Sequence, residues 1–187
     1  MTVSAWGESG KKSPEAAVKI LLNEIKQIVD REGLSDAEKA ANKKHSDIAI
    51  SILKVPEISQ KALGKYWRKH STDQQGQFQK LLGELFVHVA FPSSAKFFSD
   101  LDLVYGKTKS KKDMKVVPIT VVHKKEGEVD IDFIMKQASE DWKVVDVILD
   151  GVSMRNNLRS QFYKILKKND FNELIRRMKK KLKEAQS

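Results

Sequence analysis

Two stretches decide the class of fold: Val117-Pro-Ile-Thr-Val121 and Val129-Asp-Ile-Asp-Phe-Ile-Met135. Both follow the two-residue period of a β-strand that buries one face and exposes the other to water. The turn Lys124–Gly127 between them predicts an antiparallel hairpin. A third stretch, Trp142–Leu149, is apolar on both sides except for Asp146, and it predicts the next strand.

Helical periodicity flanks these strands on both sides. Ser13-Pro14 predicts the start of a first helix, which Gly33 is expected to end, and Ser35-Asp-Ala-Glu38 is a capping box that opens a second helix. The strongest helix follows the box Ser71-Thr-Asp-Gln74, and Pro92 is expected to stop it. Its apolar stripe consists of Phe78, Leu81, Leu82, Leu85, Phe86 and Val89.

The order of these elements gives the fold class. A weaker strand, Leu101–Tyr105, precedes the hairpin, and two amphipathic helices finish the chain. Helices, then antiparallel strands, then helices predict an α+β domain with about four strands. The length of 187 residues fits one such domain, expected over residues 13–187.

Charge is concentrated at one end of the chain. The net charge is +10, and residues 151–187 carry eleven Lys or Arg against three Asp or Glu. The C-terminal cations lie on the other side of their helix from a continuous apolar stripe, so a solvated helix face is the leading interpretation. Attraction to anionic lipid or to an acidic partner is the functional alternative. We find no nucleic-acid-binding motif and no exposed interleaving of basic and aromatic residues, so no nucleic acid is expected as a partner.

Residues that could carry catalysis are few. The chain has no cysteine, which excludes disulfides, thiolate catalysis and cysteine-bound metals, and its four histidines show no metal-binding spacing. No catalytic residue, metal site or cofactor is therefore expected. Asp146 leaves two alternatives open: a buried carboxylate held by an arginine or by backbone donors, or a general base in an apolar pocket of a small cone-shaped enzyme.

The two ends of the chain show no membrane or secretion signal. Residues 1–12 are polar and rich in Gly and Ser, and we expect them to be disordered or an engineered remnant. No stretch is long and apolar enough to span a bilayer. A cytoplasmic protein and a mature form without its signal peptide both fit this pattern.

Two segments resemble one known family. Ala62-Leu-Gly-Lys-Tyr-Trp67, followed by Ser71-Thr-Asp-Gln-Gln75, is similar to a conserved region of the MlaC, or toluene-tolerance, family of periplasmic phospholipid-binding proteins. A more specific likeness lies in Asp141-Trp-Lys-Val-Val-Asp-Val-Ile-Leu-Asp-Gly-Val-Ser153, then Asn157 and Arg159-Ser-Gln-Phe162. The resemblance extends over about residues 14–184.

This resemblance implies a lipid carrier without enzymatic activity. Family members carry a phospholipid across the periplasm between an outer-membrane MlaA-type lipoprotein complex and an inner-membrane MlaD-type ABC transporter, which maintains outer-membrane asymmetry and solvent tolerance. Their fold is similar to nuclear transport factor 2: a curved antiparallel sheet covered by helices, with a small helical subdomain expected here within residues 30–70. The resemblance implies a periplasmic monomer whose cargo is a diacyl phospholipid, with the signal peptide missing from this chain.

The apolar face of the sheet and the long helix supply the candidate lipid-binding residues. From the sheet they are Val117, Ile119, Val121, Val129, Ile131, Phe133 and Met135, and from the helix Leu82, Leu85, Phe86 and Val89. Phe97, Phe98 and Tyr105 could gate the mouth of the pocket. Arg155, Arg159, Arg176 and Arg177 are candidates for docking to acidic partner surfaces or anionic headgroups. An enzyme of the same fold with Asp146 as base, and a relative that binds hopanoids or another lipid, stay open as alternatives.

Overall fold

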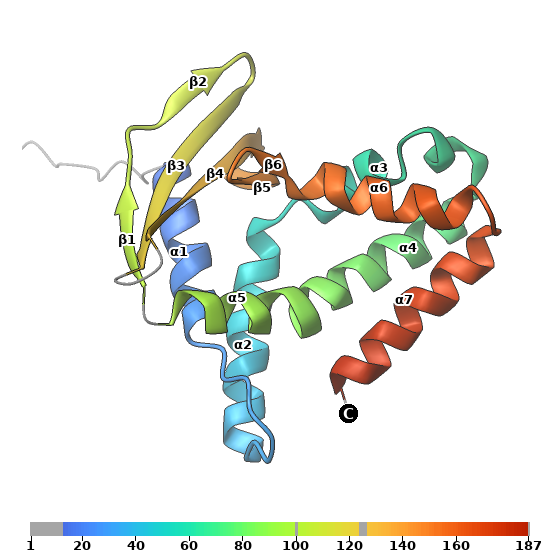
Figure 1. The fold of residues 1–187 in the computed structure, drawn as a ribbon, viewed down its shortest axis with the longest axis horizontal. Coiled ribbons are helices and arrows are strands. Elements are labelled where there is room, and N and C mark those ends of the chain that lie inside the picture. The colour runs from blue at the N-terminus through green and yellow to red at the C-terminus, as the bar shows by residue number, and fades with distance from the viewer. Residues whose placement is uncertain (1–12, 100, 124–126, 187) are drawn as a thin grey trace, which may run out of the picture.

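The protein combines an open antiparallel sheet with a set of covering helices, as the α+β prediction required (Figure 1). The structure is a computed structural model that describes residues 13–99, 101–123 and 127–186. The expectations for residues 1–12 and for the hairpin turn at 124–126 lie outside the described residues. The helices are α1 (Pro14–Lys26), α2 (Asp36–Ile52), α3 (Val55–Leu63), the 3-10 helix η1 (Gly64–Lys69), α4 (Thr72–Leu85), the π-helix η2 (Phe86–Ala90), α5 (Phe91–Phe98), α6 (Met154–Leu166) and α7 (Phe171–Gln186). The strands are β1 (Asp102–Tyr105), β2 (Lys109–Lys111), β3 (Met114–His123), β4 (Gly127–Ala138), β5 (Asp141–Leu149) and β6 (Val152–Ser153).

The sheet has six strands, and its main order is β1-β3-β4-β5-β6, with β2 also paired to β3. The prediction of about four strands missed β2 and β6. β2 is a lysine-rich segment that is exposed along its whole length, and β6 has two residues, so neither shows an alternating apolar pattern. The predicted β3–β4 hairpin is confirmed, with Val117 opposite Phe133 and Ile119 opposite Ile131.

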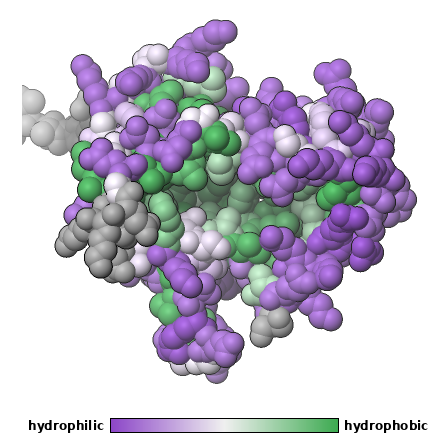
Figure 2. All heavy atoms as spheres, in the orientation of Figure 1, coloured by the Kyte–Doolittle hydropathy of each residue, from purple (hydrophilic) through white to green (hydrophobic). Residues whose placement is uncertain are grey.

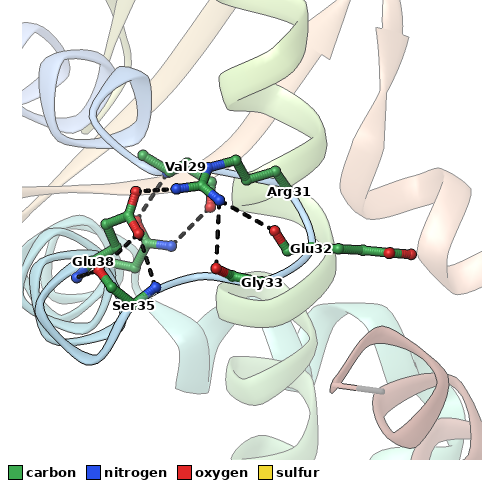
Figure 3. A network of polar contacts seen from close by, with 7 residues as sticks. Val29, Arg31, Glu32, Gly33, Ser35 and Glu38 are labelled. Carbon is green, nitrogen blue, oxygen red and sulfur yellow. Dashed lines mark hydrogen bonds and ion pairs between the residues drawn. The ribbon is translucent and has the colours of Figure 1, made fainter.

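The connection between α1 and α2 differs from the prediction that Gly33 ends the first helix. α1 ends at Lys26, because the side chain of Asn42 accepts a hydrogen bond from the Val29 N–H at 2.9 Å and donates one to the Val29 carbonyl at 2.8 Å. These bonds fix Val29 to α2, and Gly33 lies in the loop beyond it with a φ of +68°. Figure 3 shows Arg31 bridging this loop to the capping residue Glu38.

Pro92 does not stop the long helix as expected. The helix continues from α4 through η2 into α5, and Pro92 lies in the first turn of α5. The Phe91 N–H bonds to the Phe86 carbonyl five residues earlier, as in a π-helix, so the hydrogen-bond ladder is already shifted where proline contributes no N–H. The chain can therefore pass the proline while staying helical.

Two hydrophobic cores stabilise the fold. The first lies between α1, α2, α5 and the inner face of the sheet, and it includes Leu22, Phe91 and Phe133. The second lies among α3, α4, α6 and α7, where the predicted apolar stripe of α7 is buried around Leu174. Among the partly buried residues assigned to these cores, Leu53 and Phe86 pack against both.

None of the helices in the described ranges has the length and the apolar character that crossing a bilayer requires.

Candidate functional site

A hollow lined by apolar residues opens at the centre of the face drawn in Figure 2. In the same orientation, β5 and β6 border this region on one side, and α4 to α5 border it on the other (Figure 1). The two cores meet at Leu53 and Phe86, which pack against both of them. In this view the hollow lies between the sheet and the long helix (Figures 1 and 2).

Leu53 reaches this junction because the link between α2 and α3 is fixed to the sheet. Leu53 forms an isolated parallel bridge with Val144 of β5, and the Lys54 N–H donates a hydrogen bond to the Val144 carbonyl at 2.9 Å. Lys143 adds a bond from its Nζ to the Ser51 carbonyl at 2.7 Å. Together these contacts set the position of the helices at the edge of β5.

The candidate lining residues fall into two groups by burial. The deeply buried group packs against other residues in the cores; it comprises Leu82, Val117, Ile119, Val121, Ile131, Phe133, Met135 and Phe98. The half-buried group comprises Leu85, Phe86, Val89, Tyr105 and Val129. Phe97 is 44% exposed and contacts Phe98 edge to face, with ring centroids 5.0 Å apart. Only the half-buried and exposed residues are positioned to contact a ligand without prior repacking.

Sequence reasoning missed three residues on the apolar side of the sheet and at its edge: Leu53, Val147 and Leu149. Val147 lies opposite Phe133 and Leu149 lies opposite Ile131, so both are on the inner face, and all three are half-buried. The apolar character of both sides of Trp142–Leu149 was visible in the sequence. Which of its residues point inward was not, because that depends on a β-bulge.

The bulge lies at Val145, which has no partner between the pairs Met135–Val144 and Ile134–Asp146. An extra residue reverses the faces of all that follow it. Val144 is therefore on the inner face, whereas Asp146 is on the outer face beside a small separate cluster that contains Ile134 and Val145. Strict two-residue alternation would put Asp146 on the same face as Trp142 and Val144, and the bulge removes it from that face.

The Asp146 carboxylate is held by four donors. Oδ1 accepts hydrogen bonds from the N–H of Val147 at 2.9 Å and of Arg155 at 3.1 Å, and Oδ2 accepts one from the Ser153 hydroxyl at 2.6 Å. The Arg155 guanidinium lies 3.5 Å from Oδ2. This geometry is that of a structural carboxylate on the side of the sheet opposite the hollow, and it gives no support to a general base in an apolar pocket.

The remaining basic candidates are at the helical end of the molecule. Arg159 donates from Nε to the Lys61 carbonyl at 2.9 Å. Arg176 and Arg177 are exposed and both bond to Glu173, at 2.6 and 2.7 Å. The two arginine hydrogen bonds lower the pKa of Glu173 to about 2.

The two histidines His45 and His70 each contact another side chain. His45 lies 2.7 Å from Glu24, and the His70 ring packs on Phe171 with centroids 4.2 Å apart. Burial lowers the pKa of His70 and raises that of Tyr105, whose ring also lies under the Lys19 ammonium at 5.1 Å. No group of three or more potential metal ligands occurs among the residues that the structure describes.

A helix-covered antiparallel sheet with an apolar hollow at its inner face defines a class of pocketed α+β domains. The chain matches the sequence model of the MlaC protein family over residues 17–180, and it therefore belongs to that family. Its structure is similar to that of the phospholipid-binding protein from Ralstonia solanacearum in complex with a phospholipid, with a TM-score of 0.72 and 19% identity. The alignment covers 96% of this chain and 100% of that one, so the two share a fold along their whole length. No curated protein gives a significant match.

Proposed function

We propose that the protein is a phospholipid carrier that holds acyl chains in the hollow between the sheet and the α4–α5 helix. The observation that carries this proposal is the apolar-lined hollow between the sheet and the long helix (Figures 1 and 2). It is supported by membership of the MlaC family and by the phospholipid bound to the R. solanacearum protein of the same fold.

Acyl chains supply the driving force for such binding. Each buried methylene contributes about 0.8 kcal/mol, so a two-tailed lipid with about thirty methylenes carries on the order of 25 kcal/mol of hydrophobic free energy. A carrier must hide these chains without having to contact the headgroup strongly. An apolar hollow with an open mouth meets this need, and the headgroup would stay near solvent.

The half-buried residues around the hollow are the proposed first contacts. They include Leu53, Phe86, Val147 and Leu149, and Phe97 and Tyr105 are proposed at the mouth. The deeply buried candidates, such as Phe133, would line a deeper part of the pocket if α5 moves away from the sheet when lipid enters. Side-chain packing in the first core then has to rearrange during loading.

The proposed setting is the periplasm, where the protein would act as a monomer. It would receive a diacyl phospholipid from one membrane complex and release it to another, with the outer-membrane MlaA-type lipoprotein complex and the inner-membrane MlaD-type ABC transporter as partners. No cofactor or catalytic residue is required for this cycle. Family membership supports these partners and this compartment.

Mass spectrometry of organic extracts from the natively purified protein tests the proposal. We expect a co-purified diacyl phospholipid at about one molecule per chain. A polycyclic lipid at that ratio would indicate the hopanoid-binding alternative instead. A protein that is empty and that takes no lipid from vesicles would contradict the carrier function.

A further inference from the structure

A cleft of about 460 Å³ lies at the helical end of the molecule, between α3, η1 and α6. Four cationic side chains line it, from Lys61, Lys65, Arg68 and Arg159, together with Trp67. No acidic residue from the described parts of the chain contributes to the lining. We name this feature the basic cleft.

The walls of the basic cleft are fixed by contacts between η1 and α6. Arg159 donates to the Lys61 carbonyl, and the Tyr163 hydroxyl accepts a hydrogen bond from the Lys65 N–H at 3.0 Å. Gly64, with a φ of +50°, lets the chain pass against that hydroxyl, because a Cβ there would overlap it. The cations are thus displayed from a defined surface and not from a loose loop.

Aromatic rings lie among these cations. The Tyr66 and Tyr163 rings meet edge to face at 5.0 Å, and the Lys65 ammonium lies 5.3 and 5.6 Å from the two ring centroids. Lys65 and Arg68 are exposed, whereas Tyr66 and Trp67 are half-buried. Two half-buried aromatic residues thus lie between exposed cations in this segment.

A second hollow of similar volume, about 460 Å³, lies at the turn between α6 and α7. It is lined by Lys164, Lys167, Lys168 and Arg177, with Ile165 as its apolar part. Figure 1 places η1 and the α6–α7 turn at the same end of the molecule, away from the sheet. Two cation-lined hollows therefore lie at one end.

We propose that this end of the protein docks on an anionic bilayer, with lipid phosphates entering the basic cleft. Lys and Arg bind phosphate oxygens through charge-assisted hydrogen bonds, and Tyr and Trp are favoured at the level of the headgroups. Lys164, Lys167 and Lys168 of the second hollow add positive charge at the same end, whereas Arg177 there is paired with Glu173. A lipid surface fits these features better than a flat acidic protein surface does, because it offers mobile phosphates together with an apolar layer for the aromatic edges.

This docking surface goes beyond the proposed carrier function and is independent of it. The apolar hollow lies between the sheet and α4–α5, whereas the basic cleft lies on η1 and α6. A protein that contains no lipid but binds anionic vesicles would contradict the carrier function and leave the docking surface in place. A protein that loads lipid but does not bind anionic vesicles would support the carrier function and contradict the docking surface.

Co-sedimentation of the full chain with vesicles tests the proposal. The probes are vesicles of equimolar phosphatidylglycerol and phosphatidylcholine, and vesicles of phosphatidylcholine alone. The double variant Lys65→Glu/Arg68→Glu places opposite charges in the basic cleft, and Lys39→Glu/Lys44→Glu makes the same charge change on exposed positions of α2. Lys65→Gln/Arg68→Gln is a milder second variant, and circular dichroism checks that each protein is folded.

We expect binding to the anionic vesicles only, and loss of that binding at high salt. Because each basic residue near an anionic surface contributes about 1 kcal/mol, the cleft variant should bind at least about tenfold more weakly, and the α2 variant within about twofold of the unchanged protein. Equal weakening by both pairs, or equal binding to both kinds of vesicle, would overturn the proposal. It would also be overturned if the cleft variant kept its vesicle affinity but lost transfer to purified partner complexes, because the cleft would then dock on protein.

Discussion

Asp146 of β5 and Arg155 of α6 tie the first turn of α6 to the outer face of the sheet. Oδ1 of Asp146 accepts the Arg155 N–H at 3.1 Å, and Oδ2 lies 3.5 Å from the Arg155 guanidinium. Asp146 is only 6% exposed, so its charge depends on these donors and on Ser153. The pair couples the last long strand to the helices that form the second core.

Asp146→Ala should therefore reduce stability strongly. It leaves the buried donors of Arg155, Ser153 and Val147 without their acceptor, and we expect a loss on the order of 3 kcal/mol in the free energy of unfolding. Urea titration measures it. Asp132→Ala, on the same face of the sheet, is the matched control and should change stability by less than about 0.5 kcal/mol. Equal effects of the two substitutions would contradict the structural role of Asp146.

The bulge at Val145 limits how much of this site could be predicted from the sequence. Strict alternation puts Trp142, Val144 and Asp146 on one face, and a single extra residue reverses Asp146. Because apolar residues occupy both faces of β5 around Asp146, no alternation of polar and apolar residues marks the position of the bulge. The sequence could therefore predict that Asp146 is buried, but not on which face.

The β3–β4 hairpin could be predicted from the local sequence pattern, whereas the junction of the two cores could not. The one-sided pattern of β3 and β4 specifies both pairing and inner face, because a register slip would expose the apolar side chains. Leu53 packs against both cores and pairs with Val144 of β5, which is far away in the sequence, and local periodicity carries no information on such contacts. The same holds for the basic cleft, where η1 and α6 come together.

The effects of substitutions at Gly64 and Tyr163 on the free energy of unfolding should be strongly coupled. Gly64→Ala forces a side chain into a backbone region with φ near +50° and onto the Tyr163 hydroxyl. We expect a loss of about 1–3 kcal/mol. In the double variant with Tyr163→Phe, the nearest obstacle is gone, so the combined loss should be smaller than the sum of the two single losses. Thermal unfolding of the four proteins measures this; strictly additive losses would show that the hydroxyl is not what the added methyl meets.

Glu38 should titrate far below an ordinary glutamate. The Ser35 N–H at 2.8 Å, the Ser35 hydroxyl at 2.7 Å and Arg31 lower its pKa from 4.5 to about 2 (Figure 3). A carboxyl with a lowered folded pKa adds stability that is fully present above 4.5 and is lost as the pH falls through about 2. NMR titration of the side chain should give a midpoint near the lower value, and Ser35→Ala should raise it. A midpoint near 4.5 in the unchanged protein would contradict the capping geometry.

Lipid loading should respond to changes at the inner face of the sheet. Phe133→Arg puts a charge among apolar side chains, and a loss of about 3 kcal/mol in binding would lower lipid affinity more than about a hundredfold. Because Phe133 is also a core residue, Leu149→Trp provides a second test that introduces no charge. Leu149 is half-buried on the same face of the sheet, and the larger tryptophan should occupy space that we propose for lipid.

The measurement is phospholipid per chain after incubation with vesicles, with circular dichroism to confirm folding. Val104→Arg, at an edge-strand residue that is 55% exposed, is the control and should load as the unchanged protein does. Unchanged loading in both Phe133→Arg and Leu149→Trp would remove β4 and β5 from the lipid pocket. Loss in Phe133→Arg alone, with full loading in Leu149→Trp, would place the acyl chains deeper in the first core than the hollow seen at the surface.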